Sequence, residues 1–343
     1  MGVCVRRFFL GVSLGLLSMM VSCGGSGSGM ESASSVPNTG SVVLMPPKLS
    51  FSDTGLSVSD GITRNGFWAV ESDFSWEFSL DQGKTWTLGS GGSFEVKGDG
   101  PKMIWVRARD NAGNTSEIVV VTCVLDTMAP APVSVTASVD GFTRTLEVAG
   151  LEANAKWEYS LNNKMNWNSG SGSGLGTLGN GLNMIWLRQV DVAGNASEAQ
   201  VFDLSAAGSG MSHEASTNSL QPSTMAKGLL TMLIHGVVVR GDADYVRWDI
   251  PKNHRLKSVK LVRYISDDAI AFYAIQSSNV FDAGVDVSRM LVYGHMGPAD
   301  LNRNVVANIA PEKLGEGPMT IWFQQTGTLP TEYAIEISLQ AVN

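Results

Sequence analysis

The residue types that most often carry enzyme chemistry are sparse in this sequence and form no recognised catalytic pattern. The histidines are His213, His235, His254 and His295. None lies in a His-Glu-x-x-His or His-x-x-Glu-His pattern, and no Cys-x-x-Cys occurs, so the sequence offers no zinc site. A catalytic set built in space from His235 or His295 with a serine and a carboxylate stays a hypothesis. We expect no catalytic residue and no enzyme activity.

Two further groups of residues resemble catalytic arrangements in sequence but lack the structural context that catalysis needs. Residues 170–174 read Gly-Ser-Gly-Ser-Gly, near the Gly-x-Ser-x-Gly elbow of hydrolases. The elbow needs a strand-to-helix turn, whereas this stretch has the composition of a loop. Asp267 and Asp268 are adjacent, so in a strand their carboxylates would point to opposite faces and would make a poor acid–base pair.

The cysteines are Cys4, Cys23 and Cys123. Cys123 lies in a β-branched run, residues 119–125, where a free thiol packs as a small apolar side chain. If Cys23 is acylated and the residues before it are removed, Cys123 has no partner. The fold must then rest on its apolar cores and not on disulfides.

The N-terminus has the features of an export signal. Arg6 and Arg7 give a positive start, and residues 8–21 are an apolar run too short to span a bilayer as a helix. The run ends in Met20-Val21-Ser22-Cys23, which resembles the lipobox of bacterial lipoproteins. That resemblance implies a signal peptide over 1–22, lipid attachment at Cys23, and an exported protein anchored to the outer membrane or cell surface. The alternative is a plain signal peptide with an accidental cysteine.

Residues 23–47 begin with a Gly/Ser-rich stretch and predict a flexible linker. The formal net charge is −8, and no Lys/Arg stripe appears after Arg7. Proteins that bind nucleic acid need a basic patch to meet the phosphates. We therefore expect the membrane as a partner, through the lipid, and no nucleic acid.

An internal repeat is the most specific signal after the linker. Four blocks recur with a constant offset of 81 positions: 76–80 with 157–161, Trp86 with Trp167, 103–107 with 184–188, and 110–117 with 191–198. Apolar and polar residues alternate within the blocks, the period of a half-buried strand. Gly, Asn and Asp lie between them at the expected turns. The repeat predicts two Ig-like β-sandwich domains, over 48–126 and 127–206.

These blocks resemble the bacterial Ig-like domains of large surface adhesins. The shared features are Trp-Glu-Tyr-Ser-Leu, a downstream Trp, the Asp-x-Ala-Gly-Asn-x-Ser turn, and an Asp-Thr-x-Ala-Pro joint at residues 126–130. The resemblance implies a surface location. Some such adhesins bind Ca²⁺ at domain joints, which makes Asp110, Asp126 and Asp191 candidate oxygen ligands. Turn formation is the alternative role for these carboxylates, since a calcium site needs about six oxygens or more.

Paired tryptophans could stack on sugar rings, but strand tryptophans usually pack the core. Alternation favours a core role for Trp76, Trp105, Trp157 and Trp186. Trp68, Trp86 and Trp167 lie nearer turns, and both roles stay open for them.

Residues 207–227 are rich in Ala, Gly, Ser and Thr and predict a second flexible linker. Residues 228–343 again alternate as strands and predict a jelly-roll-like C-terminal sandwich. Gly-Asp-Ala-Asp-Tyr at 241–245 followed by Asp-Ile-Pro at 249–251 resembles the pre-peptidase C-terminal family of secreted accessory modules. Some members bind Ca²⁺. The candidate ligands are Asp242, Asp244, Asp267 and Asp268, and the alternative is that they are carboxylates of strand edges and turns.

The sequence thus predicts an all-β protein of tandem β-sandwiches, two Ig-like and one jelly-roll-like. Its first functional hypothesis is a non-enzymatic, lipid-anchored surface protein that acts in adhesion or binding and presents the C-terminal sandwich. The alternative is a carbohydrate-binding or accessory lipoprotein of a secreted hydrolase system. The expected ligand is an extracellular protein or a glycan.

Overall fold

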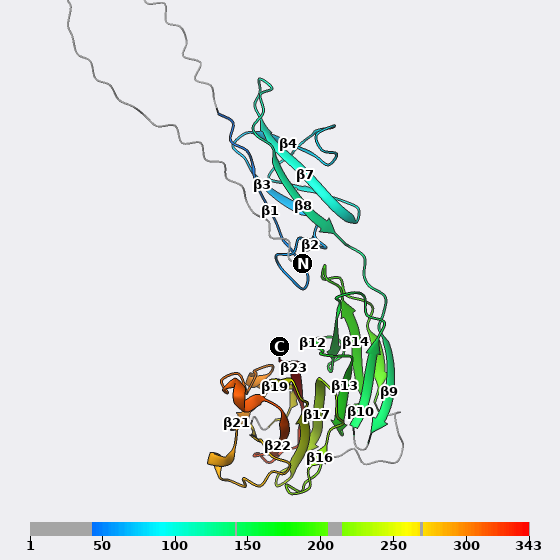
Figure 1. The fold of residues 1–343 in the computed structure, drawn as a ribbon, viewed down its shortest axis with the longest axis vertical. Coiled ribbons are helices and arrows are strands. Elements are labelled where there is room, and N and C mark those ends of the chain that lie inside the picture. Colours follow the sequence, from blue (N-terminus) through cyan, green and yellow to red (C-terminus); the bar gives the residue numbers. More distant parts are fainter. Residues whose placement is uncertain (1–42, 141–142, 205–214, 268–269, 343) are drawn as a thin grey trace, which may run out of the picture. The chain divides into compact units, whose positions relative to one another are not determined.

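The computed structural model describes residues 43–140, 143–204, 215–267 and 270–342 (Figure 1). In these ranges the regular structure is β-strand, apart from three short 3₁₀ helices. The predicted all-β class is therefore confirmed. None of the helices described here is long and apolar enough to cross a membrane. The predicted signal peptide and Cys23 lie outside the described residues.

The first sandwich forms from two sheets over residues 48–125. The smaller sheet has the strand order β1 (Lys48–Phe51), β3 (Phe67–Glu71) and β6 (Ser93–Glu95). The larger has the order β2 (Ile62–Thr63), β8 (Val119–Leu125), β7 (Gly100–Arg109), β4 (Ser75–Ser79) and β5 (Thr87–Leu88). In the second half of β7, the alternate residues Ile104, Val106 and Ala108 are buried. Trp68 and Trp76 complete this core, as the alternation requires.

The second sandwich repeats this plan. One of its sheets contains β9 (Ser134–Asp140), β10 (Thr143–Ala149) and β13 (Gly174–Gly179). The other has the order β12 (Asn168–Ser169), β11 (Lys156–Ser160), β14 (Met184–Val190) and β15 (Gln200–Asp203). Trp157, Ile185 and Leu187 lie between the sheets and are buried.

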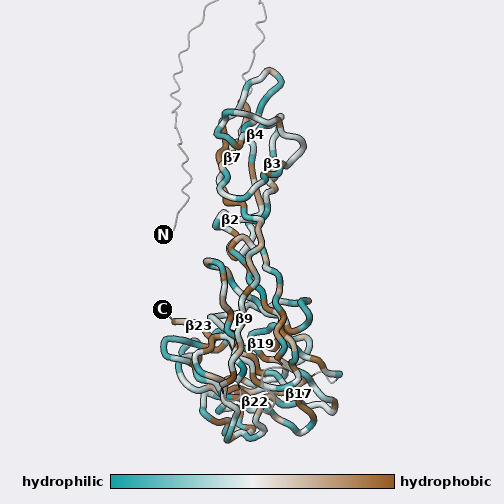
Figure 2. Tube along the Cα trace, turned by 90° about the vertical axis from the view of Figure 1, so that its right-hand side faces the viewer, coloured by the Kyte–Doolittle hydropathy of each residue, from teal (hydrophilic) through white to brown (hydrophobic). Residues whose placement is uncertain are grey.

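The C-terminal sandwich has a five-stranded sheet in the order β16 (Ser223–Thr224), β18 (Ala243–Ile250), β22 (Gly317–Gln325), β20 (Ala271–Gln276) and β21 (Val292–Met296). Facing it are β17 (Thr231–Val238), β23 (Thr331–Ala341) and β19 (His254–Ile265). Three 3₁₀ helices, η1 (Val287–Arg289), η2 (Pro298–Asp300) and η3 (Pro311–Leu314), lie in its loops. Hydrophobic and hydrophilic segments are intermixed along the chain in this region (Figure 2).

The second and C-terminal sandwiches share one sheet. Strand β13 pairs in parallel with β17, giving a six-stranded sheet in the order β19-β23-β17-β13-β10-β9. Leu233 on β17 and Ala334 on β23 belong to the core of the second sandwich, which also contains Trp157. Their neighbours Met232 and Ile335 face the opposite way, into the C-terminal core. The shared sheet is thus the middle of three layers. This differs from the sequence-based prediction, in which each sandwich has sheets of its own.

Part of the range predicted as a flexible linker, 207–227, is packed. Residues 215–227 are described, and Ala215 and Met225 are buried in the C-terminal core. Ser216 forms a bridge with Tyr245, and the short strand β16 adds to the five-stranded sheet. These residues therefore belong to the C-terminal sandwich, because their few apolar side chains are placed where they can be buried.

In each Ig-like core, a glycine packs directly against the ring of a buried tryptophan. A Cβ atom added to Gly89 would lie 2.4 Å from the Trp76 indole, and one added to Gly170 would lie 2.2 Å from the Trp157 indole. Both indole N–H groups donate to a nearby carbonyl, that of Gly91 in the first sandwich at 3.0 Å. The glycine and its tryptophan thus form a fixed contact that is repeated in both domains.

Gly89→Ala should lower the free energy of unfolding of the first sandwich by about 1–3 kcal/mol, because the methyl group would overpack the rigid Trp76 ring. Urea unfolding followed by tryptophan fluorescence measures this loss. Gly92→Ala is the matched control, since its nearest neighbour, Val70 O, is 3.7 Å from an added Cβ. Equal stability of the two variants would contradict the close contact.

Candidate functional site

The outer face of the five-stranded C-terminal sheet carries a cluster of aromatic rings. Along β22, Ile321 and Phe323 point into the core, so Trp322 and Gln324 must point outward. Tyr245 on β18 is the cross-strand partner of Trp322 on one side. This register brings large side chains from neighbouring strands into one row on the side of the sheet away from the core.

A loop over residues 277–291 covers part of this face. Phe281 is buried, and its ring centroid lies 5.5 Å from that of Trp322. The Phe281 N–H donates to the Ser219 carbonyl at 2.8 Å. Gln276 donates to Asp282 at 2.5 Å, and Arg289 pairs with the same carboxylate at 2.7 Å. The hydrogen bond from Gln276 is the main cause that holds the pKa of Asp282 below its usual value.

Where this loop ends, it leaves a groove of about 590 Å³ beside the sheet. The Phe272 ring lies 4.8 Å from Trp322 and 5.7 Å from His295, in edge-to-face arrangements. Tyr293 is 49% exposed at its rim. The remaining lining residues come from the covering loop and the strand ends: Arg240, Gly241, Val285, Val287, Met290, Gly294, Gln324, Gln325 and Thr326.

A second cavity, of about 620 Å³, lies at the far side of the same loop. Its lining carries charges of both signs, with Arg289 and Lys313 on one hand and Glu312 and Glu316 on the other. No aromatic ring lines it. The groove at Trp322 is the better candidate for a ligand site, because ligand sites combine an apolar wall with a few polar groups.

The histidines considered from the sequence lie apart in the fold. His235 is buried on β17, with Nδ1 2.7 Å from the Asn180 carbonyl oxygen. His254, at the start of β19, has Nδ1 3.0 Å from the Lys252 carbonyl oxygen. His295 is exposed on β21 and lines the groove. His213 lies outside the described residues.

The candidate calcium ligands of the Ig-like domains close turns. Asp110 accepts hydrogen bonds from the Asn114 backbone at 2.8 Å and side chain at 2.7 Å, and the side-chain bond is the main cause of its lowered pKa. Asp191 accepts the equivalent pair from Asn195, at 2.8 and 2.9 Å. Asp126 accepts from the Met128 N–H at 3.1 Å. These contacts fit the alternative role, turn formation.

The C-terminal candidates are also separated. Asp244 is buried and accepts the Tyr333 hydroxyl at 2.5 Å. Asp242 accepts from the Ala243 N–H at 2.9 Å. Asp267 is exposed, and Asp268 lies outside the described residues. Among the residues that the structure describes, no three His, Cys, Asp or Glu side chains gather as a metal site would require.

The core prediction for tryptophan is right for Trp76 and Trp157 and wrong for Trp105 and Trp186. The latter two are half-buried on the outer faces of their sheets. Ile104 and Ile185 beside them in the sequence take the inward positions. Alternation alone defines two faces of a strand, and both faces here carry large apolar side chains. Trp68 belongs to the core.

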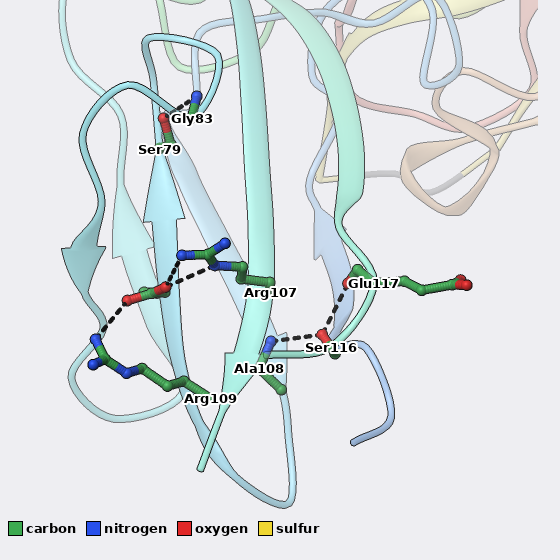
Figure 3. Close-up of polar contacts among 8 residues, drawn as sticks. Ser79, Gly83, Arg107, Ala108, Arg109, Ser116 and Glu117 are labelled. Atoms are coloured by element: carbon green, nitrogen blue, oxygen red, sulfur yellow. Dashed lines mark hydrogen bonds and ion pairs between the residues drawn. The ribbon is translucent and has the colours of Figure 1, made fainter. Parts of the chain in front are cut away.

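Trp86 and Trp167 lie under arginine side chains. The Arg107 guanidinium carbon is 3.8 Å from the Trp86 ring centroid, and Arg107 also pairs with Glu77 at 2.6 Å (Figure 3). Arg109 approaches the same carboxylate at 3.4 Å. The second sandwich repeats the arrangement with Trp167, Arg188 and Glu158. These rings are occupied by cation–π contacts, which favours a structural role for them.

No family model matches this chain, and no curated protein matches it. Solved structures similar to it include carbohydrate-binding modules of the β-sandwich superfamily, at 9% identity and a TM-score of 0.20, over 88% of this chain and 94% of that one. The FN1–FN3 domains of chicken CNTN1 share 10% identity at a TM-score of 0.17, over 82% and 90%. A Streptomyces avermitilis α-L-rhamnosidase complexed with L-rhamnose shares 9% identity at a TM-score of 0.19, over 86% and 39%. Similarity at this level carries no argument about function.

Proposed function

We propose that this chain is a non-enzymatic binding protein of the bacterial cell surface, held at the membrane by a lipid on Cys23. Its ligand site is the groove on the C-terminal sandwich, and its ligand is a glycan. The two Ig-like sandwiches, which lie between the anchor and that site in the sequence, act as spacers. Adhesion to a glycan-coated surface is the activity that this arrangement supports.

The observation that carries the proposal is the composition of the groove. Phe272, Trp322 and Tyr293 give it aromatic walls, while Gln324 and Thr326 supply amide and hydroxyl groups. A sugar ring presents an apolar C–H face together with hydroxyl groups that both donate and accept. Aromatic faces with nearby hydrogen-bonding groups match both properties.

Tyr293→Ala should weaken glycan binding about tenfold, because one aromatic face covered by a ligand contributes about 1.5 kcal/mol. Tyr293 is half exposed, so its loss should leave the fold intact. A glycan array, followed by titration with the sugars that it selects, measures the effect. Phe67→Ala removes an aromatic ring that is 58% exposed on β3 and is the matched control. An array on which the wild-type chain binds nothing would overturn the proposal.

The anchor has its own test. Cells that express the full chain should incorporate radiolabelled palmitate into it, and Cys23→Ser should abolish the label, because the thioether can form only at this cysteine. Cys123→Ser is the control, since its thiol is buried. A label that persists in Cys23→Ser, or is missing from the wild type, would contradict lipid attachment at Cys23.

A further inference from the structure

The groove differs in charge from the protein that contains it. The chain has a formal net charge of −8, yet no Asp or Glu side chain lines the groove. Its lining includes Arg240 and His295, the groups that carry or can accept a positive charge. A groove without acidic side chains repels an anion less than the rest of an acidic surface does. Arg240 in its lining can bind such an anion directly.

Arg240 is free to meet a ligand. It is exposed on the turn between β17 and β18, and no hydrogen bond or ion pair engages it within the described part of the chain. Asp242, two residues away, directs Oδ1 to the Ala243 N–H at 2.9 Å. The guanidinium therefore keeps all its donors for a partner.

The carboxylates of the covering loop are also engaged elsewhere. Asp286 accepts from the Ser288 N–H at 3.1 Å and from its hydroxyl at 2.7 Å, at the start of η1. Asp282 is paired with Arg289 at 2.7 Å. Neither lines the groove, although Val285 and Val287 on the same loop do. The loop contributes apolar surface to the groove and no negative charge.

We infer that the groove selects acidic sugars, such as hexuronates, over neutral ones. This inference rests on the proposed glycan-binding function. The sugar ring lies against Tyr293 and the rings beside it, and its anionic group pairs with Arg240. A planar guanidinium can donate two parallel hydrogen bonds to a carboxylate, and it binds a sulfate by the same chemistry. Arg240 is then the residue that determines specificity, while the aromatic walls provide binding common to all sugars.

The experiment titrates the full chain, by calorimetry, with oligosaccharides of galacturonate, mannuronate and glucuronate and with the carboxyl-reduced form of each. Sulfated neutral oligosaccharides form a third arm. We expect at least one acidic sugar to bind about tenfold more tightly than its reduced form, as one charged hydrogen-bonded pair would provide. Arg240→Gln should remove that difference and leave binding of the reduced form unchanged. Lys252→Gln, which removes an exposed positive charge outside the groove, should keep the difference.

The outcomes separate the two proposals. Equal binding of acidic and reduced sugars would overturn the acidic preference and leave glycan binding intact. A preference that survives Arg240→Gln would overturn the role of Arg240. Tighter binding of the sulfated arm than of the uronates would identify sulfate as the anionic group and support the inference in its general form. Absence of binding in every arm would overturn the proposed function together with the inference.

Discussion

Leu233→Ala is expected to lower the free energy of unfolding by about 3 kcal/mol and to loosen two sandwiches at once. Leu233 lies on β17, a strand of the C-terminal region, but its side chain is fully buried in the core of the second Ig-like sandwich. Removing it leaves a cavity in that core. Strand β17 also pairs with β23, which contributes to the C-terminal core. Loosening β17 should therefore destabilise the C-terminal sandwich as well.

Hydrogen exchange read by mass spectrometry is the measurement. Peptides from β11 and β14, in the outer sheet of the second sandwich, and from β20 and β22, in the outer sheet of the C-terminal sandwich, should lose protection together. Val70→Ala, in the core of the first sandwich, is the control and should leave all four strands protected. Faster exchange confined to β11 and β14 would show that the two sandwiches unfold separately and would contradict a shared sheet that couples them.

The second large effect is a loss of stability above pH 10 that depends on two buried tyrosines. The Tyr159 hydroxyl donates to Glu336 at 2.6 Å, and the Tyr333 hydroxyl donates to Asp244 at 2.5 Å. Burial is the main cause that raises the pKa of each tyrosine well above its usual value, and the facing carboxylates raise it further. Lys260 approaches Glu336 only to 4.0 Å and does not offset this.

The direction of the effect follows from the two states. In the unfolded chain a tyrosine releases its proton near pH 10, whereas the folded chain retains it. The stabilisation is therefore complete below about pH 10 and is lost as pH rises toward the folded pKa values. Tyr159→Phe should cost about 2 kcal/mol at neutral pH, because it leaves the Glu336 carboxylate without its closest donor. The same variant should lose stability less steeply above pH 10.

Urea unfolding from pH 8 to pH 11.5, together with phenolate absorbance, measures both parts of this prediction. Tyr293→Phe, at the exposed rim of the groove, is the matched control and should behave as the wild type does. A Tyr159 hydroxyl that titrates freely near pH 10, or stability of Tyr159→Phe equal to wild type at every pH, would contradict the buried Tyr159–Glu336 bond.

The sequence was a good guide to the Ig-like sandwiches because their signals are local. Alternation over residues 104–109 predicts a strand where β7 forms, and the offset of 81 positions predicts the equivalent strand, β14, in the second copy. The same alternation misassigned Trp105, since a strand with large side chains on both faces does not reveal which face is covered. The buried face of a strand is the one that the opposite sheet covers. The position of that sheet cannot be predicted from the local sequence pattern of the strand.

The shared sheet and the groove could not be predicted from local sequence patterns. Strand β13 contains Gly174, Gly176 and Gly179 and has the composition of a loop, yet all of its residues are buried. Its two faces pack into different cores, Leu175 into that of the second sandwich and Leu178 into that of the C-terminal sandwich. Its parallel pairing with β17 joins segments more than fifty residues apart. The continuous apolar run over residues 269–275 predicts a fully buried central strand. In the structure, Phe272 faces outward, and its surroundings depend on the cross-strand register and on where the covering loop ends.

Hydrogen exchange of the full chain, with and without the oligosaccharide that it binds most tightly, shows whether the groove beside Trp322 is the ligand site. We predict new protection in β20–β22 and in residues 285–291, with no change in β7 or β14. Protection that appears instead on the outer faces of the Ig-like sheets, around Trp105 or Trp186, would place the ligand site there and not in the groove.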